Sequence, residues 1–238
     1  MKLKLLFFDV ETAPNLSYHW FGKHEQEIIE IVEEGYMLSF AYKWLGEKSV
    51  KSYSLATFKG NRKKLIEKLW ELFNEADIVC GHNAKQFDVK WANRAFVFYG
   101  LTPPSPFKVV DTLTEARTKF KFNSNRLNDL GTYLKIGNKL ETGGFPLWKR
   151  CMAGDKKAFA LMEKYNRQDI VLLEKIYLRL RPYMNHPKIN IEYGQCENCG
   201  SKSVVKNGAH ILVGGFKKDQ YQCKDCGHWF SPFKKYKI

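Results

Sequence analysis

Two carboxylates close an apolar segment near the start of the chain. The largely apolar run from Leu3 to Phe8 is followed by Asp9 and then by Glu11. Residues two apart on a β-strand point to the same face, so both carboxylates converge at one strand end. A buried carboxylate is costly unless it is paired or binds a metal ion. The D-x-E pair alone is a frequent chance pattern, and it gains meaning only from partners elsewhere in the chain.

Three further residues are candidates for that partnership. Asp88 follows the short apolar segment 78–81 in "CGHNAKQFDVKW", and Tyr165 and Asp169 are four residues apart in "EKYNRQDIVLL". That spacing places the tyrosine and the aspartate on one face of a helix. Asp88 as a helix N-cap, and the other two as an exposed helical pair, are the alternatives. Hard carboxylate oxygens suit Mg²⁺ or Mn²⁺.

Four cysteines form a second candidate metal site. Cys196-x-x-Cys199 and Cys223-x-x-Cys226 are separated by 23 residues. Four thiolates make a tetrahedral Zn²⁺ site, and the metal supplies folding energy that a segment of about 45 residues otherwise lacks. The gap is longer than the usual range, which a longer hairpin absorbs. Two redox dithiols are the alternative, and the surrounding sequence does not resemble a redox fold.

The elements that must position these residues follow from the apolar pattern. Strands are expected over 3–10, 37–44, 49–54, 78–81 and 107–111, and helices over 62–74, 89–99, 127–134 and 155–180. A break near Asn166 is expected in the last helix, and the acidic stretch 26–34 is expected to be a surface helix or an insertion. Strands that alternate with helices after an initial hairpin predict an α/β domain with a mixed sheet.

A change of composition near Pro187 predicts the domain boundary. Two prolines and a polar stretch end the last predicted helix, and a cysteine-containing, helix-poor segment follows. We therefore expect a domain over residues 1–187, and a linker with a small zinc ribbon over residues 188–238.

The composition favours a polyanionic partner. The 238 residues include 39 Lys and Arg against 25 acids, a net charge of +14, and the apolar fraction of 44% is enough for a real core. Nucleic acid is the first expectation and an anionic membrane surface the second, with a merely basic soluble protein as the alternative. No segment approaches the ~20 apolar residues of a membrane helix, and no signal peptide precedes the first strand. We expect a cytoplasmic protein.

The acidic motifs, taken together, resemble the DEDDy branch of the 3′–5′ exonucleases in the RNase H-like superfamily. The three motifs of that family are matched in order by D-x-E at Asp9 and Glu11, N-x-x-x-(F/Y)-D from Asn83 to Asp88, and Y-x-x-x-D at Tyr165 and Asp169. The resemblance covers about residues 1–187. It implies an RNase H-like mixed five-stranded sheet flanked by helices, with the first three strands antiparallel. The stretch 26–34 and the tail have no counterpart in the minimal domain.

The resemblance also implies a two-metal mechanism. Two Mg²⁺ or Mn²⁺ ions about 3.5–4 Å apart clamp a scissile phosphate. The resemblance implies that Asp9 bridges both ions, that Glu11 and Asp169 complete the coordination of the first ion, and that Asp88 holds the second. It also implies that Tyr165 orients the attacking water and that Thr12 and Asn83 contact the last nucleotides.

Five other reactive or polar residues are expected to be structural. His82 is interpreted as a hydrogen-bonded histidine, with a substrate contact as the alternative, and Asp111 as structural or secondary. Cys80 and Cys151 are interpreted as small buried apolar residues. His228, beside a zinc knuckle, is expected to be a surface residue.

The segment with the four cysteines resembles the zinc ribbons of transposase-type and other DNA-handling proteins. Residues 189–238 hold eight lysines against four acids. Tyr221, Trp229, Phe230, Phe233 and Tyr236 lie among those lysines, so the segment is suited to grip a nucleic-acid strand by stacking and charge. The alternative, equally favoured for Trp229 and Phe230, is that they form the ribbon's own core.

These observations predict a metal-dependent 3′–5′ exonuclease that releases mononucleotides from single-stranded 3′ ends. DNA is favoured over RNA because of the ribbon. The alternatives are an RNase H-like endonuclease or RNase, and a catalytically idle nucleic-acid-binding or recruitment module. Proofreading in trans, with the ribbon bound to a polymerase or another replication or repair protein, is a further possibility.

Overall fold

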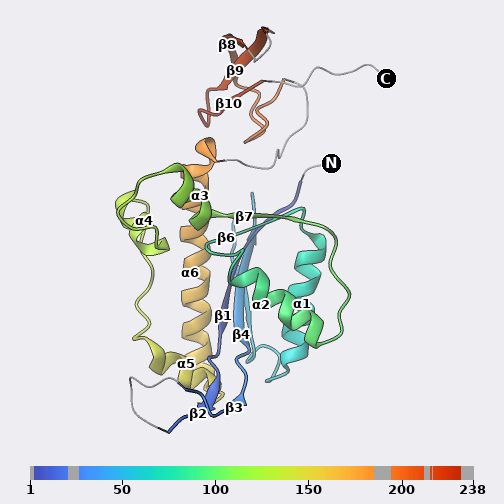
Figure 1. Ribbon diagram of the computed structural model, residues 1–238, viewed down its shortest axis with the longest axis vertical. Helices are drawn as coiled ribbons and strands as arrows, with labels where there is room; N and C mark the ends of the chain where they lie inside the picture. Colours follow the sequence, from blue (N-terminus) through green and yellow to red (C-terminus); the bar gives the residue numbers. More distant parts are fainter. Residues whose placement is uncertain (1–2, 21–26, 185–193, 212–214, 216, 232–238) are drawn as a thin grey trace.

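A five-stranded mixed sheet organises the main part of the molecule (Figure 1). The computed structural model describes residues 3–20, 27–184, 194–211, 215 and 217–231. The strand order is β5-β4-β1-β6-β7, with β1, β4 and β5 antiparallel and β6 and β7 parallel to β1. The strands are β1 (Leu5–Thr12), β4 (Met37–Trp44), β5 (Lys51–Ser54), β6 (Ile78–Gly81) and β7 (Lys108–Asp111). The predicted sheet, including its three antiparallel strands, is confirmed.

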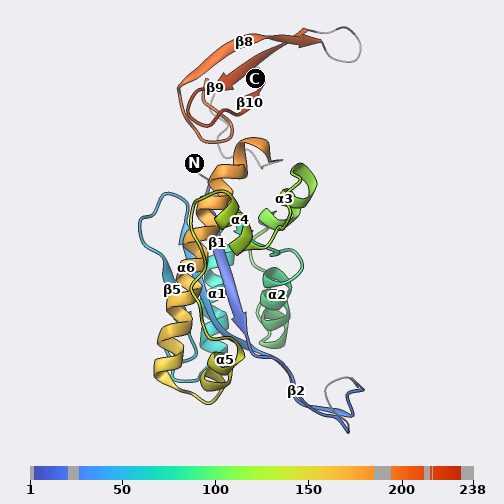
Figure 2. The same ribbon diagram turned by 90° about the vertical axis from the view of Figure 1, so that its left-hand side faces the viewer.

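Helices cover both faces of this sheet (Figure 2). The helices are α1 (Arg62–Glu75), α2 (Asp88–Phe98), α3 (Thr112–Lys119), α4 (Leu127–Tyr133), α5 (Phe145–Met152) and α6 (Lys156–Leu180). Alternation along β1 decides which helices each face meets. Leu6 and Phe8 belong to a core shared with α1 and α2, whereas Leu5 and Phe7 belong to a core shared with α3, α4 and the C-terminal half of α6. The first half of β1, Leu5–Phe8, is buried on both faces and is consequently apolar at every position, which explains the opening run of the sequence.

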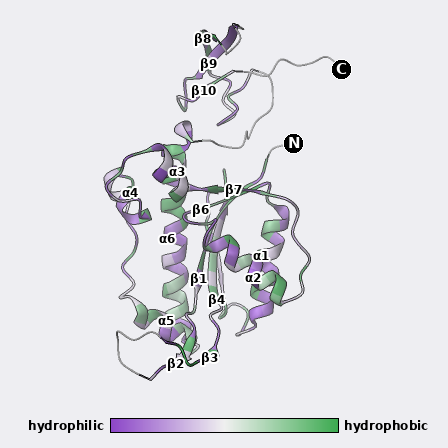
Figure 3. Ribbon diagram, in the orientation of Figure 1, coloured by the Kyte–Doolittle hydropathy of each residue, from purple (hydrophilic) through white to green (hydrophobic). Residues whose placement is uncertain are grey.

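Helix α6 is continuous over 25 residues, so the predicted break near Asn166 is wrong. Asp155 caps its start by accepting hydrogen bonds from the backbone N–H groups of Lys157 and Ala158. Asparagine disturbs helices when its side chain competes for the helix backbone. Here the fully buried Asn166 amide is bound to Asp9 on β1, so it does not compete with the helix backbone. Figure 3 shows hydrophobic and hydrophilic positions along α6, as expected for a helix with one face on the sheet.

Two short helices and one hairpin differ from the expectations. Helices α3 and α5 have eight residues each and bury only two each, Thr112 and Ala116 in α3 and Leu147 and Cys151 in α5, so neither shows a clear periodic apolar pattern. The described part of the acidic stretch, 27–34, contains β3 (Glu30–Glu33) rather than a helix. β3 pairs with β2 (Leu16–Tyr18) in an antiparallel hairpin, which agrees with the insertion alternative. No helix among the described residues is long and apolar enough to cross a membrane.

A separate three-stranded antiparallel sheet forms the C-terminal part. Its strands are β8 (Val204–Ile211), β9 (Lys217–Cys223) and β10 (Trp229–Phe230), in the order β10-β9-β8. Its small core contains Phe230, whereas Trp229 is 45% exposed, which separates two residues that the sequence left equivalent. The predicted boundary near Pro187 lies outside the described residues.

Contacts join this sheet to the end of α6. The Arg181 Nε donates a hydrogen bond of 2.7 Å to Asn198 Oδ1, and both side chains are buried. His228 Nδ1 lies 3.2 Å from the backbone oxygen of Pro182, and its ring stacks on Phe230. His228 is therefore partly buried at this contact, and its interpretation as a surface residue is wrong.

Gly131 on α4 is a position where the fold requires the absence of a side chain. A Cβ there would lie 2.4 Å from the backbone oxygen of Gly137 and 2.8 Å from a methyl carbon of Leu172 on α6. We predict that Gly131→Ala lowers the free energy of unfolding by about 1–3 kcal/mol, measured by urea denaturation, because it overpacks this contact. A glycine-to-alanine change in an open helix has the opposite sign, about 0.5–1 kcal/mol of stabilisation. Stabilisation by Gly131→Ala would contradict the close packing of α4 on α6.

Candidate active site

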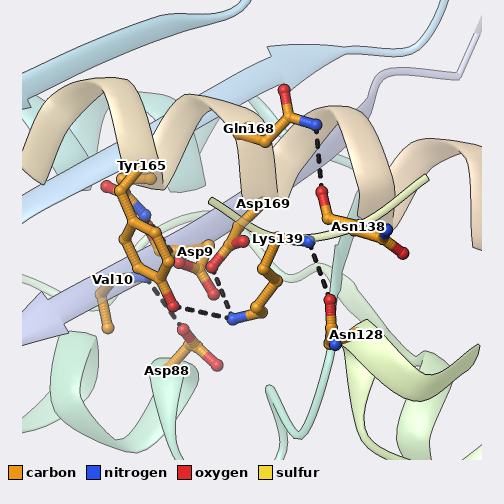
Figure 4. A network of polar contacts seen from close by, with 10 residues as sticks. Asp9, Val10, Asp88, Asn128, Asn138, Lys139, Tyr165, Gln168 and Asp169 are labelled. Atoms are coloured by element: carbon orange, nitrogen blue, oxygen red, sulfur yellow. Dashed lines mark hydrogen bonds and ion pairs between the residues drawn. The ribbon is translucent and has the colours of Figure 1, made fainter. Parts of the chain in front are cut away.

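Three of the four predicted carboxylates meet at the end of β1. One ligand oxygen from each of Asp9, Glu11 and Asp169 lies within 4.8 Å of the others. Asp9 and Glu11 are two residues apart on β1 and share one of its faces. Asp169 approaches Asp9 from the middle of α6 (Figure 4). The side chain of Asp169 is 2% exposed, which argues against the alternative of an exposed helical pair.

Asp88 lies beside this group and is fixed by the backbone of β1. Its carboxylate accepts a hydrogen bond of 3.0 Å from the backbone N–H of Val10, and its side chain is buried. It is the first residue of α2, whose N-cap is Phe87, so Asp88 is not the N-cap. Although it is not among the three clustered acids, its charge raises the pKa of Asp9, which places it in the same electrostatic site.

Tyr165 and Asp169 point to the same side of α6, as their spacing predicts (Figure 4). The ring of Tyr165 packs edge-on against Trp148 of α5, with ring centroids 6.2 Å apart. Burial, followed by the nearby charge of Asp169, raises the pKa of Tyr165 to about 12. The phenol is therefore neutral at physiological pH and acts as a hydrogen-bonding group.

Lys139 is a component of the site that the sequence analysis missed. Its Nζ lies 2.6 Å from Asp169 Oδ2 and 2.9 Å from the Tyr165 hydroxyl oxygen. Hydrogen bonds hold the segment between α4 and α5 that carries Lys139. The backbone N–H of Lys139 donates to Asn128 Oδ1, and Gln168 Nε2 donates to the backbone oxygen of Asn138. One lysine in a chain with 39 basic residues gives no local signal of such a role.

Asn166 is the second component that was missed. Its Nδ2 donates hydrogen bonds to Asp9 Oδ2 at 2.6 Å and to the backbone oxygen of Asp9 at 3.2 Å. The Asn166 side chain therefore fixes the carboxylate of Asp9, the residue that the resemblance implies as the ligand shared by both metal ions. A polar residue next to Tyr165 in a strongly apolar helix was an available signal, although it was interpreted as a break in the helix.

The carboxylates are electrostatically unfavourable as four anions. Burial is the largest cause of their raised pKa values, and for Asp9 and Glu11 repulsion from the other acids adds to it. The pKa of Glu11 rises to about 8 and that of Asp88 to about 7, and those of Asp9 and Asp169 also rise. Asp169 Oδ1 is buried without a hydrogen-bond partner. Hard oxygens, excess negative charge and an unpartnered acceptor all fit divalent cations such as Mg²⁺ or Mn²⁺.

Thr12 and Asn83, the predicted nucleotide contacts, have defined backbone positions. Thr12 ends β1, and a register shift against β4 lies between Glu11 and Thr12. Asn83 adopts a left-handed conformation with φ of 70°, and its backbone N–H donates to Asp111. Their contacts with nucleotides remain predictions.

The structural interpretations of His82, Asp111, Cys80 and Cys151 are confirmed. His82 makes hydrogen bonds to Thr112 Oγ1 and to the backbone oxygen of Asn125, and burial lowers its pKa to about 4, which keeps the ring neutral. The Asp111 carboxylate caps α3 and also accepts from two backbone N–H groups of the turn before α2. Both cysteines are buried free thiols.

The four C-terminal cysteines form one cluster. A sulfur atom from each of Cys196, Cys199, Cys223 and Cys226 lies within 4.8 Å of the others, and none is in a disulfide. Two of the sulfur pairs are 3.7 and 3.6 Å apart. A tetrahedral zinc–thiolate centre with bonds of about 2.3 Å has sulfur atoms about 3.8 Å apart. The donor set and its spacing therefore fit Zn²⁺.

The sequence also matches a known family. The RNase_H superfamily profile matches residues 6–181, which is most of the chain. The chain belongs to the RNase H superfamily. No curated protein gives a significant match. The described sheet and flanking helices are accordingly an RNase H-like fold.

A solved structure with a similar fold is that of the family B DNA polymerase from the hyperthermophilic archaeon Pyrobaculum calidifontis. The TM-score is 0.54 at 14% sequence identity, and the match covers 76% of this chain. The match covers 25% of the polymerase chain, so this chain corresponds to about a quarter of the length of that protein. At this identity, the likeness concerns the fold.

The raised carboxylate pKa values predict a pH-dependent stability. Between the ordinary carboxylate pKa near 4 and the value of about 8 for Glu11, the folded protein retains protons that the unfolded chain has lost. In zinc-loaded protein free of other divalent ions, we therefore expect the melting temperature to fall between about pH 5 and pH 8. Added Mn²⁺ raises it again at pH 8.

The matched variants are Asp9→Asn and, as the control, Glu141→Gln at an exposed acid. Asp9→Asn removes one of the repelling charges, so we expect a smaller loss of melting temperature with pH and a smaller response to Mn²⁺. Glu141→Gln should behave as wild type. A wild-type melting temperature that does not change with pH or with Mn²⁺ would contradict this electrostatic description.

The cysteine cluster predicts a structural zinc ion. We expect one zinc per chain by elemental analysis, and its loss in Cys223→Ser because a thiolate ligand is removed. Amide hydrogen exchange should then become fast in β8 and β9 while β1 remains protected. Cys151→Ala, at a buried thiol outside the cluster, should retain zinc. Full zinc content in Cys223→Ser would argue against the site.

Proposed function

We propose that this chain is a DEDDy-type, metal-dependent 3′–5′ exonuclease. The observation that carries the proposal is the convergence of Asp9, Glu11 and Asp169 at the end of β1. Asp88 and Tyr165 supply the remaining members of the three motifs at the same site. Membership of the RNase H superfamily supports a nuclease in general. The order and identity of the motifs support the 3′–5′ exonuclease in particular.

The proposed ligands of two Mg²⁺ or Mn²⁺ ions are Asp9, Glu11, Asp88 and Asp169. When bound, such ions activate water and stabilise the charge that develops on the leaving oxygen. Asn166 orients the Asp9 carboxylate through its 2.6 Å hydrogen bond, and the backbone N–H of Val10 orients Asp88. The protein therefore holds each of these two carboxylates in one rotamer before substrate arrives.

Tyr165 is proposed to position the attacking water. Its pKa of about 12 makes it a poor base, so its hydroxyl orients rather than removes a proton. Lys139 holds the hydroxyl from one side and Trp148 packs on the ring. The ammonium group of Lys139 also supplies the positive charge closest to Asp169, where a scissile phosphate would add negative charge.

The proposed substrate is a single-stranded 3′ end, DNA before RNA, with 5′-mononucleotides as products. Thr12 and Asn83 are proposed to contact the terminal nucleotides. Residues 1–187 are proposed as the catalytic domain, and residues 188–238 as linker and ribbon with one structural Zn²⁺. The ribbon's resemblance to those of DNA-handling proteins supports DNA, and is compatible with recruitment to a polymerase or a repair protein. A cytoplasmic location is part of the same proposal.

The test uses 5′-labelled single-stranded DNA and RNA of the same sequence, with Mg²⁺ or Mn²⁺. We predict a ladder that shortens from the 3′ end, and a loss of at least a hundredfold in rate for Asp169→Ala, because a metal ligand is removed. Cys151→Ala serves as a control outside the motifs. Comparison of the cleavage rates on DNA and on RNA shows which of the two is the preferred substrate.

Two outcomes would redirect the proposal. A single internal cut would indicate an endonuclease. Salt-sensitive binding without cleavage by either metal would indicate a binding or recruitment module, since phosphate contacts weaken as the salt concentration rises.

A further inference from the structure

Four aromatic rings from the ends of α3, α4 and α6 form a continuous row on the surface. Tyr183, Phe120, Phe122 and Tyr133 contact one another in that order, with ring centroids 5.6, 5.2 and 5.4 Å apart. The central two rings are stacked with an interplanar angle of 20°, and each outer ring meets its neighbour edge-on. We call this set the aromatic row.

The row is only partly explained by packing. Phe120 and Phe122 each place part of their surface against the core that α6 shares with the sheet. Tyr133 is 68% exposed and Tyr183 is 70% exposed. A single exposed aromatic side chain is ordinary, but a joined set of them on a surface indicates a binding site.

The charge around the aromatic row is positive. Arg117, Lys121 and Arg126 lie in the same segment of chain and are exposed, and none forms an ion pair with a described residue. Lys135 follows Tyr133 and is exposed as well. Aromatic rings interleaved with unpaired basic side chains are complementary to bases and phosphates of a single strand.

The aromatic row is connected to the active site through α4. Tyr133 is the last residue of this helix, and Asn128, in its first turn, accepts the backbone N–H of Lys139. Thr132 Oγ1 and Asn138 Oδ1 are 2.8 Å apart, so the end of α4 also contacts the segment leading into the site. In Figures 1 and 2, this segment runs from α4 beside α6 toward α5. A strand that leaves the acidic cluster along this segment is therefore directed toward α4, which carries Tyr133.

We propose that the aromatic row binds the single-stranded segment 5′ of the terminal nucleotides, by stacking bases on Tyr133 and Tyr183. The direction of the bound strand rests on the proposed nuclease function. Binding itself requires only the aromatic row and its charges. The row makes affinity depend on strand length, because a short oligonucleotide fills the active site without reaching α4.

The experiment measures binding of the zinc-loaded full chain, without Mg²⁺ or Mn²⁺, to labelled single-stranded DNA by fluorescence anisotropy. The two probes are a trinucleotide and an oligonucleotide of about 12 nucleotides, a length within the usual range for single-strand binding folds. In Tyr133→Ala/Tyr183→Ala, we expect the ratio of the two affinities to fall about tenfold. The control is Phe98→Ala on α2, an aromatic residue outside the row that is 79% exposed, which should retain the wild-type ratio.

A second variant tests the charge. Lys121→Glu/Arg126→Glu should weaken binding of the longer strand and make its salt dependence shallower, because phosphate contacts are lost. An unchanged length ratio in the double tyrosine variant, or an equal fall in Phe98→Ala, would overturn the proposal. Failure of the nuclease proposal is seen separately, as absence of cleavage by the wild type, and leaves this binding comparison decisive for the aromatic row.

Discussion

Holding four carboxylates together in a largely buried space is the constraint on which the structure depends. Like charges repel strongly where water is excluded, and each acid also loses its hydration. Each acid has a polar contact of its own, and the positive charge of Lys139 opposes the rise in the pKa of all four. These contacts are Asn166 with Asp9, Trp148 with Glu11, the Val10 N–H with Asp88, and Lys139 with Asp169. The single lysine leaves the cluster negative, which is the physical basis for expecting divalent cations.

The fold supplies rigidity where these contacts need it. β1 lies at the centre of the sheet and is buried on both faces, so the backbone that carries Asp9 is fixed by packing on two sides. Helix α6 is capped by Asp155 at its start, and at its end Arg181 contacts Asn198 of the C-terminal part. Tyr165 and Asp169 therefore lie in the interior of a long helix that is held at both ends.

The sequence predicted the elements whose signal is local and long. Apolar segments and helical periodicity located the strands of the sheet and α6, and the motif spacing located the acids. Lys139 was not predictable in this way, because its position depends on how α4 packs on α6 through Gly131, which no local pattern records. Asn166 was misread because a buried partner on β1, 157 residues away, decides whether its side chain disturbs the helix. Helices α3 and α5 bury only two residues each, so their apolar patterns were too weak to be recognised.

The measurement that tests the central claim most directly is anomalous diffraction from crystals of the zinc-loaded protein soaked in Mn²⁺. The account predicts manganese density between the carboxylates of Asp9, Glu11 and Asp169, with a second peak beside Asp88. The zinc signal at the four cysteines provides an internal reference in the same crystal. Absence of manganese density in the acidic cluster, with Lys139 still bridging Asp169 and Tyr165, would contradict the claim that these carboxylates form a metal site.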